Sequence, residues 1–263
     1  MFWLWLNLLL TTILNGVSPM SMGLPPYTSI GAGTVYEANS SSVTVTPNAN
    51  TQIGDLVVIV LGAGALSGFN WPPAFSGDPW VALGVGYNGT DYESHLMWAC
   101  IAPRNGSSGW ANITLPATLY VAAQTHTFRI PTPACFDLDH VGRGEGFVYN
   151  SASGTPLDAP RIDQPYQQVI DLVGRSYFNG GTTTTVGDIT NFTERFDTGG
   201  TTGQHGVVLN DRTAAIIGSV QNPSVTSALA AAKTGRFGTR AMIPIVGFQS
   251  PGRGRYGSHR VIF

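Results

Sequence analysis

Six consecutive apolar residues, Leu56-Val57-Val58-Ile59-Val60-Leu61, are the stretch that decides the fold. Four of them are β-branched, and β-branched side chains are more favourable in strands than in helices. The run is too short for a typical helix and follows a turn pair, Gly54-Asp55. It has no polar face, so it predicts a central strand that is buried on both sides.

Further strand patterns flank this run, separated by joints rich in Gly, Asn, Asp and Pro. In Ser42–Thr46, valines alternate with hydroxyl residues, which is typical of a half-buried strand. Strands at this spacing predict an all-β fold, an antiparallel two-sheet β-sandwich that is jelly-roll-like. The other expected strands are Gly33–Ala38, Asp55–Gly64, Trp80–Gly86, Ser94–Ala102, Ala111–Leu115, Tyr120–Ile130, Gly146–Asn150, Gln167–Phe178, Asn191–Phe196, Gly206–Leu209, Thr213–Val220 and Thr239–Phe248. Only the alanine-rich Ser224–Lys233 predicts a helix.

A weak internal repeat relates two parts of the chain. Val43–Val60 and Leu157–Val173 share the order extended strand, turn and apolar strand. Each is followed by a Gly-rich loop and an aromatic strand, at Trp80 and at Phe192. Two related halves that fold together would make one two-sheet sandwich.

The composition limits the class of function. The chain has 263 residues, of which 11% are charged, with 33 Gly and 17 Pro. A β-sandwich of this length is commonly one domain. The formal net charge is −2, and Lys233 is the only lysine. Binding to nucleic acid needs a broad basic face, so we expect no nucleic-acid partner.

The two ends differ from the rest of the chain, which divides it into residues 1–29, 30–250 and 251–263. The first part contains the apolar run Phe2–Leu14, and three interpretations of it stay open. It has the length of a signal-peptide core but lacks the basic residues that precede one. In the second interpretation, the run is retained and needs a hydrophobic partner surface. In the third, the true start of the protein is Met20 or Met22, and the run precedes it.

The last part, Arg253–Phe263, spaces arginines with glycines and is too flexible to fold alone. Arginine pairs with carboxylates through two parallel hydrogen bonds, which suits docking on a partner. We therefore predict that both ends are docking arms. The residues that would dock are Trp3, Trp5, Arg253, Arg255 and Arg260.

No catalytic signature emerges from the sequence. A Gly-x-Ser-x-Gly nucleophile turn is absent, and His95 and His126 lie inside strand patterns, where a hydrogen-bonded sheet residue is the favoured interpretation. Asp137, Asp139 and His140 are candidate metal ligands, but a solvated loop with an Asx-turn is favoured. The Gly-rich residues 142–146 lack the ending of a phosphate loop and predict an ordinary loop. We expect no enzyme activity, cofactor or metal.

Cysteines and aromatic residues complete the candidates. Cys100 lies in an apolar run that predicts a buried thiol, and a bridge to Cys135 is left open. Aromatic rings near loops stack on the apolar faces of sugars, so glycan contact is assigned to three residues. They are Trp71, Tyr87 and Tyr92, whereas Trp80 is interpreted as a core residue.

Several of these segments carry a family resemblance. They are Gly54-Asp55 with the strand that follows, Trp71-Pro72-Pro73, Gly77-Asp78-Pro79-Trp80, Ser94–Ala102 and the strand that ends in Phe128-Arg129-Ile130. The order resembles the β-sandwich domains of tailed-phage minor tail and virion-surface proteins, with their pattern GDLLV…PPxGW…yyKvA…fRG. It covers about residues 30–250. The chain departs from the pattern where Asp-Pro precedes Trp80 in place of Ser-Gly, and where Ile130 follows Arg129 in place of Gly.

The resemblance implies a structural role in the virion and no catalytic residues. It implies a surface β-sandwich subunit of the minor tail, fibre or capsid-decoration type, which acts by protein–protein packing. Its expected partners are other virion subunits, further copies of the chain and a host-surface glycan. The alternative is a secreted carbohydrate-binding module, for which the apolar leader would be the signal peptide.

Overall fold

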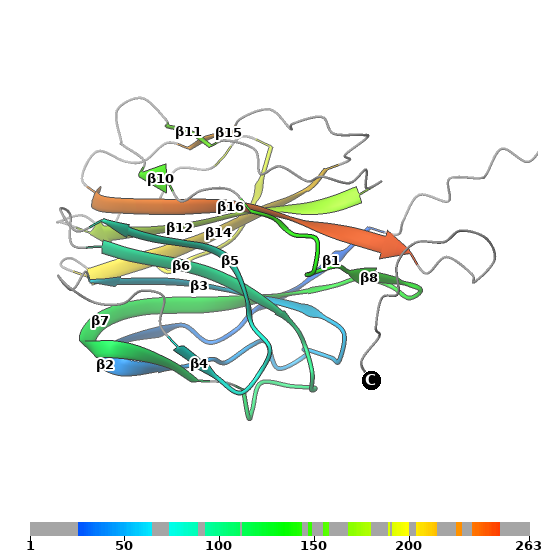
Figure 1. Cartoon of the computed structure of the whole chain (residues 1–263), viewed down its shortest axis with the longest axis horizontal. Helices are drawn as coiled ribbons and strands as arrows, with labels where there is room; N and C mark the ends of the chain where they lie inside the picture. The colour runs from blue at the N-terminus through cyan, green and yellow to red at the C-terminus, as the bar shows by residue number, and fades with distance from the viewer. Residues whose placement is uncertain are drawn as a thin grey trace, which may run out of the picture.

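The protein is described by a computed structural model that covers residues 26–64, 74–88, 93–110, 112–143, 147–148, 155–157, 168–179, 189, 191–199, 204–214, 225–227 and 233–247. Within these ranges all regular structure is β-strand, and two antiparallel sheets pack against each other (Figure 1). The predicted all-β two-sheet sandwich is therefore confirmed. The described ranges contain no helix that is long and apolar enough to cross a membrane.

The first sheet takes its strands from the first half of the chain. Its order is β1-β7-β3-β6-β5, and β2 and β4 also pair with β7. The bounds are β1 Thr28–Ala32, β2 Tyr36–Thr44, β3 Leu56–Gly64, β4 Ala74–Ser76, β5 Val81–Asn88, β6 Glu93–Ile101 and β7 Asn112–Arg129.

The second sheet takes its strands from the second half. Its order is β10-β16-β12-β14-β13, and β8 and β9 also pair with β16. The bounds are β8 Ala134–Phe136, β9 Gly142–Arg143, β10 Phe147–Val148, β12 Gln168–Asn179, β13 Thr193–Asp197, β14 Gln204–Ala214 and β16 Lys233–Gly247. A separate two-stranded sheet joins β11 (Thr155–Leu157) to β15 (Val225–Ser227).

The two sheets repeat one strand order. The series β7-β3-β6-β5 of the first sheet corresponds to β16-β12-β14-β13 of the second. Their central strands, β3 and β12, are the two apolar strands that the weak sequence repeat relates, so the two halves share a topology. Each sheet takes its strands from one half of the chain. In a jelly roll, by comparison, the strands of the two Greek keys are distributed over both sheets. Across the interface, β14 packs over β7 and β3, β12 over β3 and β6, and β16 over β6 and β5.

The central strand β3 is buried on both faces, as predicted. Leu56, Val58 and Val60 lie in the core between the two sheets, where β12, β14 and β16 contribute further aliphatic side chains. The residues between them face a second core on the other side of the first sheet. There they pack against Val43 of β2 and Ile113 of β7. A strand with apolar neighbours on both faces needs a continuous apolar sequence, and β3 has one.

The long strand β7 serves both layers of the first half. It was predicted as two strands, Ala111–Leu115 and Tyr120–Ile130, and forms one that is interrupted in its pairing. Ser40 of β2 pairs with Leu119 and Ser42 pairs with Thr114, so the residues between Thr114 and Leu119 lack regular partners. Pro116 lies in this interruption, where its missing N–H breaks no regular pair.

Four further local predictions were wrong. Gly206–Leu209 and Thr213–Val220 were expected to be separate strands, but Gln204–Ala214 forms one strand, β14, while residues 215–220 lie outside the described ranges. Ser224–Lys233 was expected to be a helix, but Val225–Ser227 forms β15 and Lys233 begins β16, while residues 228–232 lie outside the described ranges. The described residues at both ends of this segment therefore belong to strands. Gly33–Ala38 was expected to be one strand and instead holds the junction between β1 and β2. Gly142 and Arg143 were expected in a loop and pair with β16.

Candidate functional site

Most predicted site residues lie outside the described part of the chain. These are Trp3, Trp5, Trp71, Tyr92, Arg253, Arg255 and Arg260. Tyr87 lies in β5, but its side chain is also outside the description. Their assignments as glycan contacts and docking residues therefore stay predictions. Trp80 is half-buried against the second core, which confirms its interpretation as a core residue.

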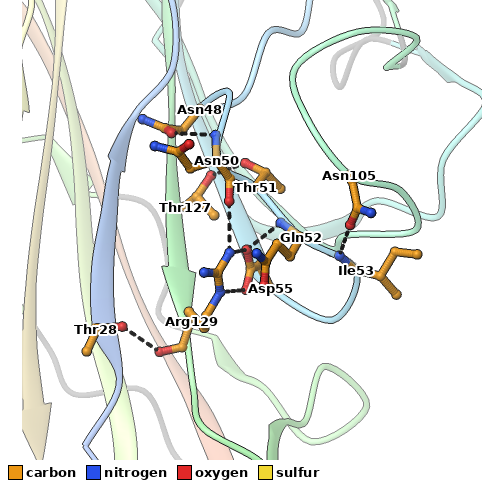
Figure 2. Close-up of polar contacts among 10 residues, drawn as sticks. All are labelled: Thr28, Asn48, Asn50, Thr51, Gln52, Ile53, Asp55, Asn105, Thr127 and Arg129. Atoms are coloured by element: carbon orange, nitrogen blue, oxygen red, sulfur yellow. Dashed lines mark hydrogen bonds and ion pairs between the residues drawn. The ribbon is translucent and has the colours of Figure 1, made fainter.

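The best-defined polar site among the described residues is the loop of residues 48–55, which joins β2 to β3 (Figure 2). Its end is fixed by an ion pair between Asp55 and Arg129. Arg129 Nε donates to Asp55 Oδ1 at 2.8 Å, and Arg129 Nη2 donates to Asp55 Oδ2 at 2.8 Å. Arg129 Nη2 also donates to the carbonyl of Asn50 at 2.8 Å. One guanidinium therefore holds both ends of the loop.

Strand register explains this ion pair. β3 and β7 are antiparallel neighbours, and Leu56 lies opposite Phe128. The residue before Leu56 and the residue after Phe128 must then face each other, and these are Asp55 and Arg129. The Asp55 side chain is 3% exposed and that of Arg129 is 30% exposed. Hydrogen bonding to the Asp55 carboxylate raises the pKa of Arg129, which favours the charged form of the guanidinium beside this acid.

From Asn50 onward, the backbone N–H groups of the loop are all hydrogen-bonded. Every N–H from Asn50 to Asp55 has an acceptor within the described residues. In chain order the acceptors are Asn48 Oδ1 (2.9 Å), the Asn48 carbonyl (3.0 Å), Asp55 Oδ2 (2.7 Å), Asn105 Oδ1 (2.9 Å), the Ala102 carbonyl (3.0 Å) and the Gln52 carbonyl (3.0 Å). Such a loop is fixed by its own backbone, and its outward side chains are displayed on a rigid support.

Further bonds attach the loop to the sheet. The Thr51 and Thr127 hydroxyls lie 2.9 Å apart, and Asn48 Nδ2 donates to the carbonyl of Ala32 at 3.0 Å. The N–H of Gly106 donates to the carbonyl of Thr51 at 2.8 Å. The loop is therefore tied to β7, to the end of β1 and to the neighbouring loop that follows β6.

An open depression of about 1030 Å³ lies beside this loop. Its lining includes Ser29 of β1, the loop residues Asn50, Gln52 and Ile53, Asn105 and Arg129. Ile53 is 68% exposed, and the side-chain amides of Asn50 and Gln52 make no hydrogen bond to the described part of the chain. The depression thus presents uncharged hydrogen-bonding groups beside one apolar side chain.

Another motif of the resemblance, Gly77-Asp78-Pro79-Trp80, is joined to this site. The carboxylate of Asp78 accepts a hydrogen bond from Arg104, whose guanidinium carbon lies 5.9 Å from the ring centre of Trp110. The Trp110 ring is 6.2 Å from that of Trp80, and Trp110 Nε1 donates to the carbonyl of Gly106 at 3.0 Å. The Gly-Asp-Pro-Trp segment therefore stabilises the loop that supports Asn105.

Both histidines that the sequence placed in strand patterns, His95 and His126, are buried, and each is hydrogen-bonded as the favoured interpretation predicted. His95 Nδ1 lies 3.1 Å from Ser176 Oγ, and His95 Nε2 lies 3.0 Å from Thr239 Oγ1, so this imidazole links β6 to β12 and β16. Burial lowers the pKa of His95 to about 3. A neutral imidazole between two hydroxyls is a structural link between the sheets.

The other histidine, His126, lies beside a serine in an arrangement that a hydrolase would use. Ser29 Oγ is 2.8 Å from His126 Nε2, and Ser29 lines the depression. Burial, with a contribution from Arg195, lowers the pKa of His126 to about 3, which makes it a weak base at neutral pH. Its buried Nδ1 has no hydrogen-bond partner within the described residues. No acid among the described residues is therefore bonded to this nitrogen, where the orienting acid of a triad would lie. The carboxylate of Asp211 accepts hydrogen bonds from Tyr27 and Arg195.

A buried charged cluster in the second sheet was not predicted. Asp171 accepts hydrogen bonds from Arg240 at 2.8 and 2.7 Å and from Arg212 at 2.7 Å. Asp171 is fully buried and Arg240 is 1% exposed. The signal in the sequence was a single acid inside the apolar run Val169–Val173. Such an acid in a buried strand requires a cationic partner on a neighbouring strand.

The candidate metal ligands form a turn. Asp137 Oδ1 accepts from the backbone N–H of Asp139 at 3.0 Å and of His140 at 3.3 Å, and Asp137 Oδ2 lies 2.8 Å from His140 Nδ1. This is the Asx-turn that the sequence favoured. Nowhere in the described ranges do three His, Cys, Asp or Glu side chains gather in a way that could hold a metal ion.

The two cysteines are not bonded to each other. Cys100 is buried and Cys135 is half-buried, and both are free thiols. Burial raises the pKa of the Cys100 thiol to about 12, and burial also raises the pKa of Cys135. Both thiols are therefore protonated and weakly nucleophilic at neutral pH.

Comparison of the sequence with models of protein families found no match. Comparisons with curated proteins and with solved structures likewise found no match.

Sequence reasoning named both partners of the loop ion pair but not the pair itself. Asp55 and Arg129 each belong to a segment that carries the resemblance. Their contact depends on the register of two strands that are far apart in the chain. A signal was present, because an acid directly before one apolar strand and an arginine directly after another become neighbours when the strands are antiparallel.

Proposed function

We propose that the protein is a structural subunit of a tailed-phage virion, a surface β-sandwich of the minor tail, fibre or capsid-decoration type. One observation supports this best. Asp55 and Arg129 each belong to a segment that carries the resemblance to virion-surface domains. They form one ion pair, which fixes the loop of residues 48–55. In this chain the shared pattern is architectural, as expected for a subunit that acts by packing and presents rigid loops to its neighbours.

The chemistry of the described residues supports the same proposal. His95 is held between two hydroxyls inside the sandwich, and His126 is a weak base without an orienting acid. The exposed loop side chains are uncharged, namely two amides, one isoleucine and one alanine. Such surfaces suit contacts with other virion subunits, with further copies of the chain and with a host surface. The two docking arms belong to this proposal, because each would hold the subunit on a partner.

The test is the copy number of the protein in purified phage particles. Quantitative mass spectrometry on gradient-purified particles, with a major capsid subunit as internal standard, should find a fixed copy number. That number should survive a high-salt wash that removes adsorbed proteins. Absence from washed particles would contradict the proposal. If the protein is instead recovered from the medium with a mature start near residues 17–24, it is secreted, as the alternative carbohydrate-binding module requires.

A further inference from the structure

The depression beside the loop of residues 48–55 contains hydrogen-bonding side chains that the fold does not use. Asn50 and Gln52 line it, and their side-chain amides are not bonded to the described part of the chain. Arg129 uses Nε and Nη2 in the ion pair and the contact with Asn50, and Nη1 takes part in none of these bonds. We infer that this depression binds a neutral carbohydrate chain.

The first argument is the match of donors and acceptors. Each side-chain amide offers a donor and an acceptor a short distance apart, and each sugar hydroxyl both donates and accepts. Asn50 and Gln52 therefore present two such pairs on one loop, and Arg129 Nη1 adds a donor among the lining residues. The exposed Ile53 adds an apolar surface for the C–H groups of a sugar ring.

The second argument is charge. Arg129 is the only charged residue among those that line the depression, and the carboxylate of Asp55 neutralises it at 2.8 Å. An acidic ligand would therefore find no free positive charge of the kind that recognises carboxylates and phosphates. A cationic ligand would find no unpaired carboxylate in the lining. A neutral ligand fits these groups best.

The third argument separates a glycan from a peptide. An extended peptide can dock on a sheet edge as an added strand, through backbone hydrogen bonds. Here the loop N–H groups from Asn50 to Asp55 already have acceptors, and the pairing of β1 is interrupted between Ser29 and Gly31. A bulge of this kind disfavours the addition of a strand. The groups that remain are side-chain amides, which suit a polyhydroxylated ligand. The loop is also fixed before binding, which lowers the entropy lost on association.

This inference does not depend on the virion proposal, because a carbohydrate site is compatible with any location of the protein. The test uses the full chain on an array of neutral and acidic oligosaccharides. The neutral probes are maltohexaose, cellohexaose, chitohexaose and mannose oligomers, and the acidic probes are sialylated and uronic-acid glycans. Neutral probes that bind are then titrated by calorimetry against the wild type and three variants.

The double variant Asn50→Ala/Gln52→Ala should lower the affinity for the bound neutral glycan at least about tenfold, because two amide pairs are lost. The matched control is Asn39→Ala, an exposed amide on β2 outside the depression, which should bind as the wild type does. Circular dichroism and melting curves should show that both variants are folded. In the double variant, neither replaced side chain has a hydrogen bond to the described residues to lose.

Three results would overturn the inference. The first is that no neutral glycan binds the wild type. The second is that binding is restricted to acidic glycans. The third is that the double variant binds with wild-type affinity. A third variant, Trp71→Ala, separates the two candidate glycan surfaces. Loss of binding in this variant, combined with full binding in the double variant, would place the glycan on the loop aromatics and overturn the assignment to the depression.

Discussion

Asp55 and Arg129 form an ion pair in which the acid is almost completely buried and the base is partly solvated. The carboxylate is 3% exposed and accepts a third hydrogen bond, from the N–H of Gln52. A buried carboxylate tolerates its surroundings only while its charge and lone pairs are satisfied. The two partners therefore depend on each other unequally. Removal of the arginine leaves a buried carboxylate without its cation, which costs more free energy than leaving the partly solvated arginine alone.

Replacement of Arg129 by methionine should lower the free energy of unfolding by about 2–3 kcal/mol. Methionine keeps part of the aliphatic stem but leaves Asp55 without its cation. The matched control is Arg143→Met, at an exposed arginine of β9 that should change stability by less than about 0.5 kcal/mol. Urea unfolding at pH 7 measures both. Equal stabilities for the two variants would show that the loop ion pair has no structural role.

His95 should make stability depend on pH. The unfolded chain binds a proton on this histidine below about pH 6.5, whereas the folded chain binds it only near a pKa of about 3. Because the folded pKa is lowered, stability should fall as the pH falls through this window, by about 1.4 kcal/mol per pH unit for each such histidine. His126 adds a similar dependence, because its pKa is also about 3.

The check is the slope of unfolding free energy against pH between pH 6 and pH 4, for the wild type and His95→Gln. The variant should be less stable at pH 7, because it loses a hydrogen-bonded ring between the sheets. The slope of its unfolding free energy against pH should be shallower, by the amount that corresponds to about one proton fewer taken up on unfolding. The carboxylates contribute to both slopes and cancel in the comparison. Parallel lines would mean that His95 is protonated in the folded protein.

At the scale of elements, the two central strands approach each other closely. A Cβ atom built on Gly62 of β3 would lie 2.8 Å from Ser176 Cβ, and one built on Gly174 of β12 would lie 2.8 Å from Met97 Sδ. Each central strand thus carries a glycine where the opposite sheet leaves no room for a side chain. Close contact between layers is what allows short aliphatic side chains to fill the core.

Gly62→Ala should therefore destabilise the protein by about 1–3 kcal/mol through overpacking. The control lies on the same strand, because a Cβ on Gly64 would meet only His205 Nε2 at an ordinary distance of 3.6 Å. Gly64→Ala should then be close to neutral. Thermal and urea unfolding of both variants test the spacing between the sheets. A neutral Gly62→Ala would show that the sheets are further apart than described.

The accuracy of the sequence predictions follows the range of the interactions involved. β3 was predictable because six adjacent apolar side chains predict its burial. The Asx-turn at Asp137 was predictable because its hydrogen bonds span no more than three residues. The pairing of Asp55 with Arg129 was not predictable in the same way, since it joins residues 74 positions apart. The helix expected over Ser224–Lys233 failed for the same reason, because Val225–Ser227 pairs with Thr155–Leu157, a partner that is distant in the chain.

At the scale of the molecule, each half of the chain makes one sheet, and the core lies between the halves. Only the short segment Ile130–Pro133 separates β7 from β8, and its last three residues, Pro131–Pro133, are exposed. The contacts that hold the halves together are side chains of β14, β12 and β16 against β7, β3, β6 and β5. The covalent link between the halves therefore adds little to the contacts that form the core.

A protease site inserted between Pro131 and Thr132 tests this description. After cleavage, the two pieces should elute together in size-exclusion chromatography and should unfold in a single transition, because neither sheet can bury its apolar face alone. Insertions in exposed connections are generally tolerated, so the uncut protein should be as stable as the wild type. Separation of the pieces after cleavage in native buffer would show that the inter-sheet core is weaker than its burial indicates.

The connection at Pro131–Pro133 also has a consequence for behaviour on dilution. If two separate chains formed this sandwich, their association would cost roughly 4–15 kcal/mol of free energy for the lost translational and rotational freedom. The two chains would then dissociate at low concentration. On one chain the second sheet is always present at a high effective concentration. The inter-sheet core therefore persists at any dilution, and a single molecule that leaves an assembly keeps its apolar interior closed to water.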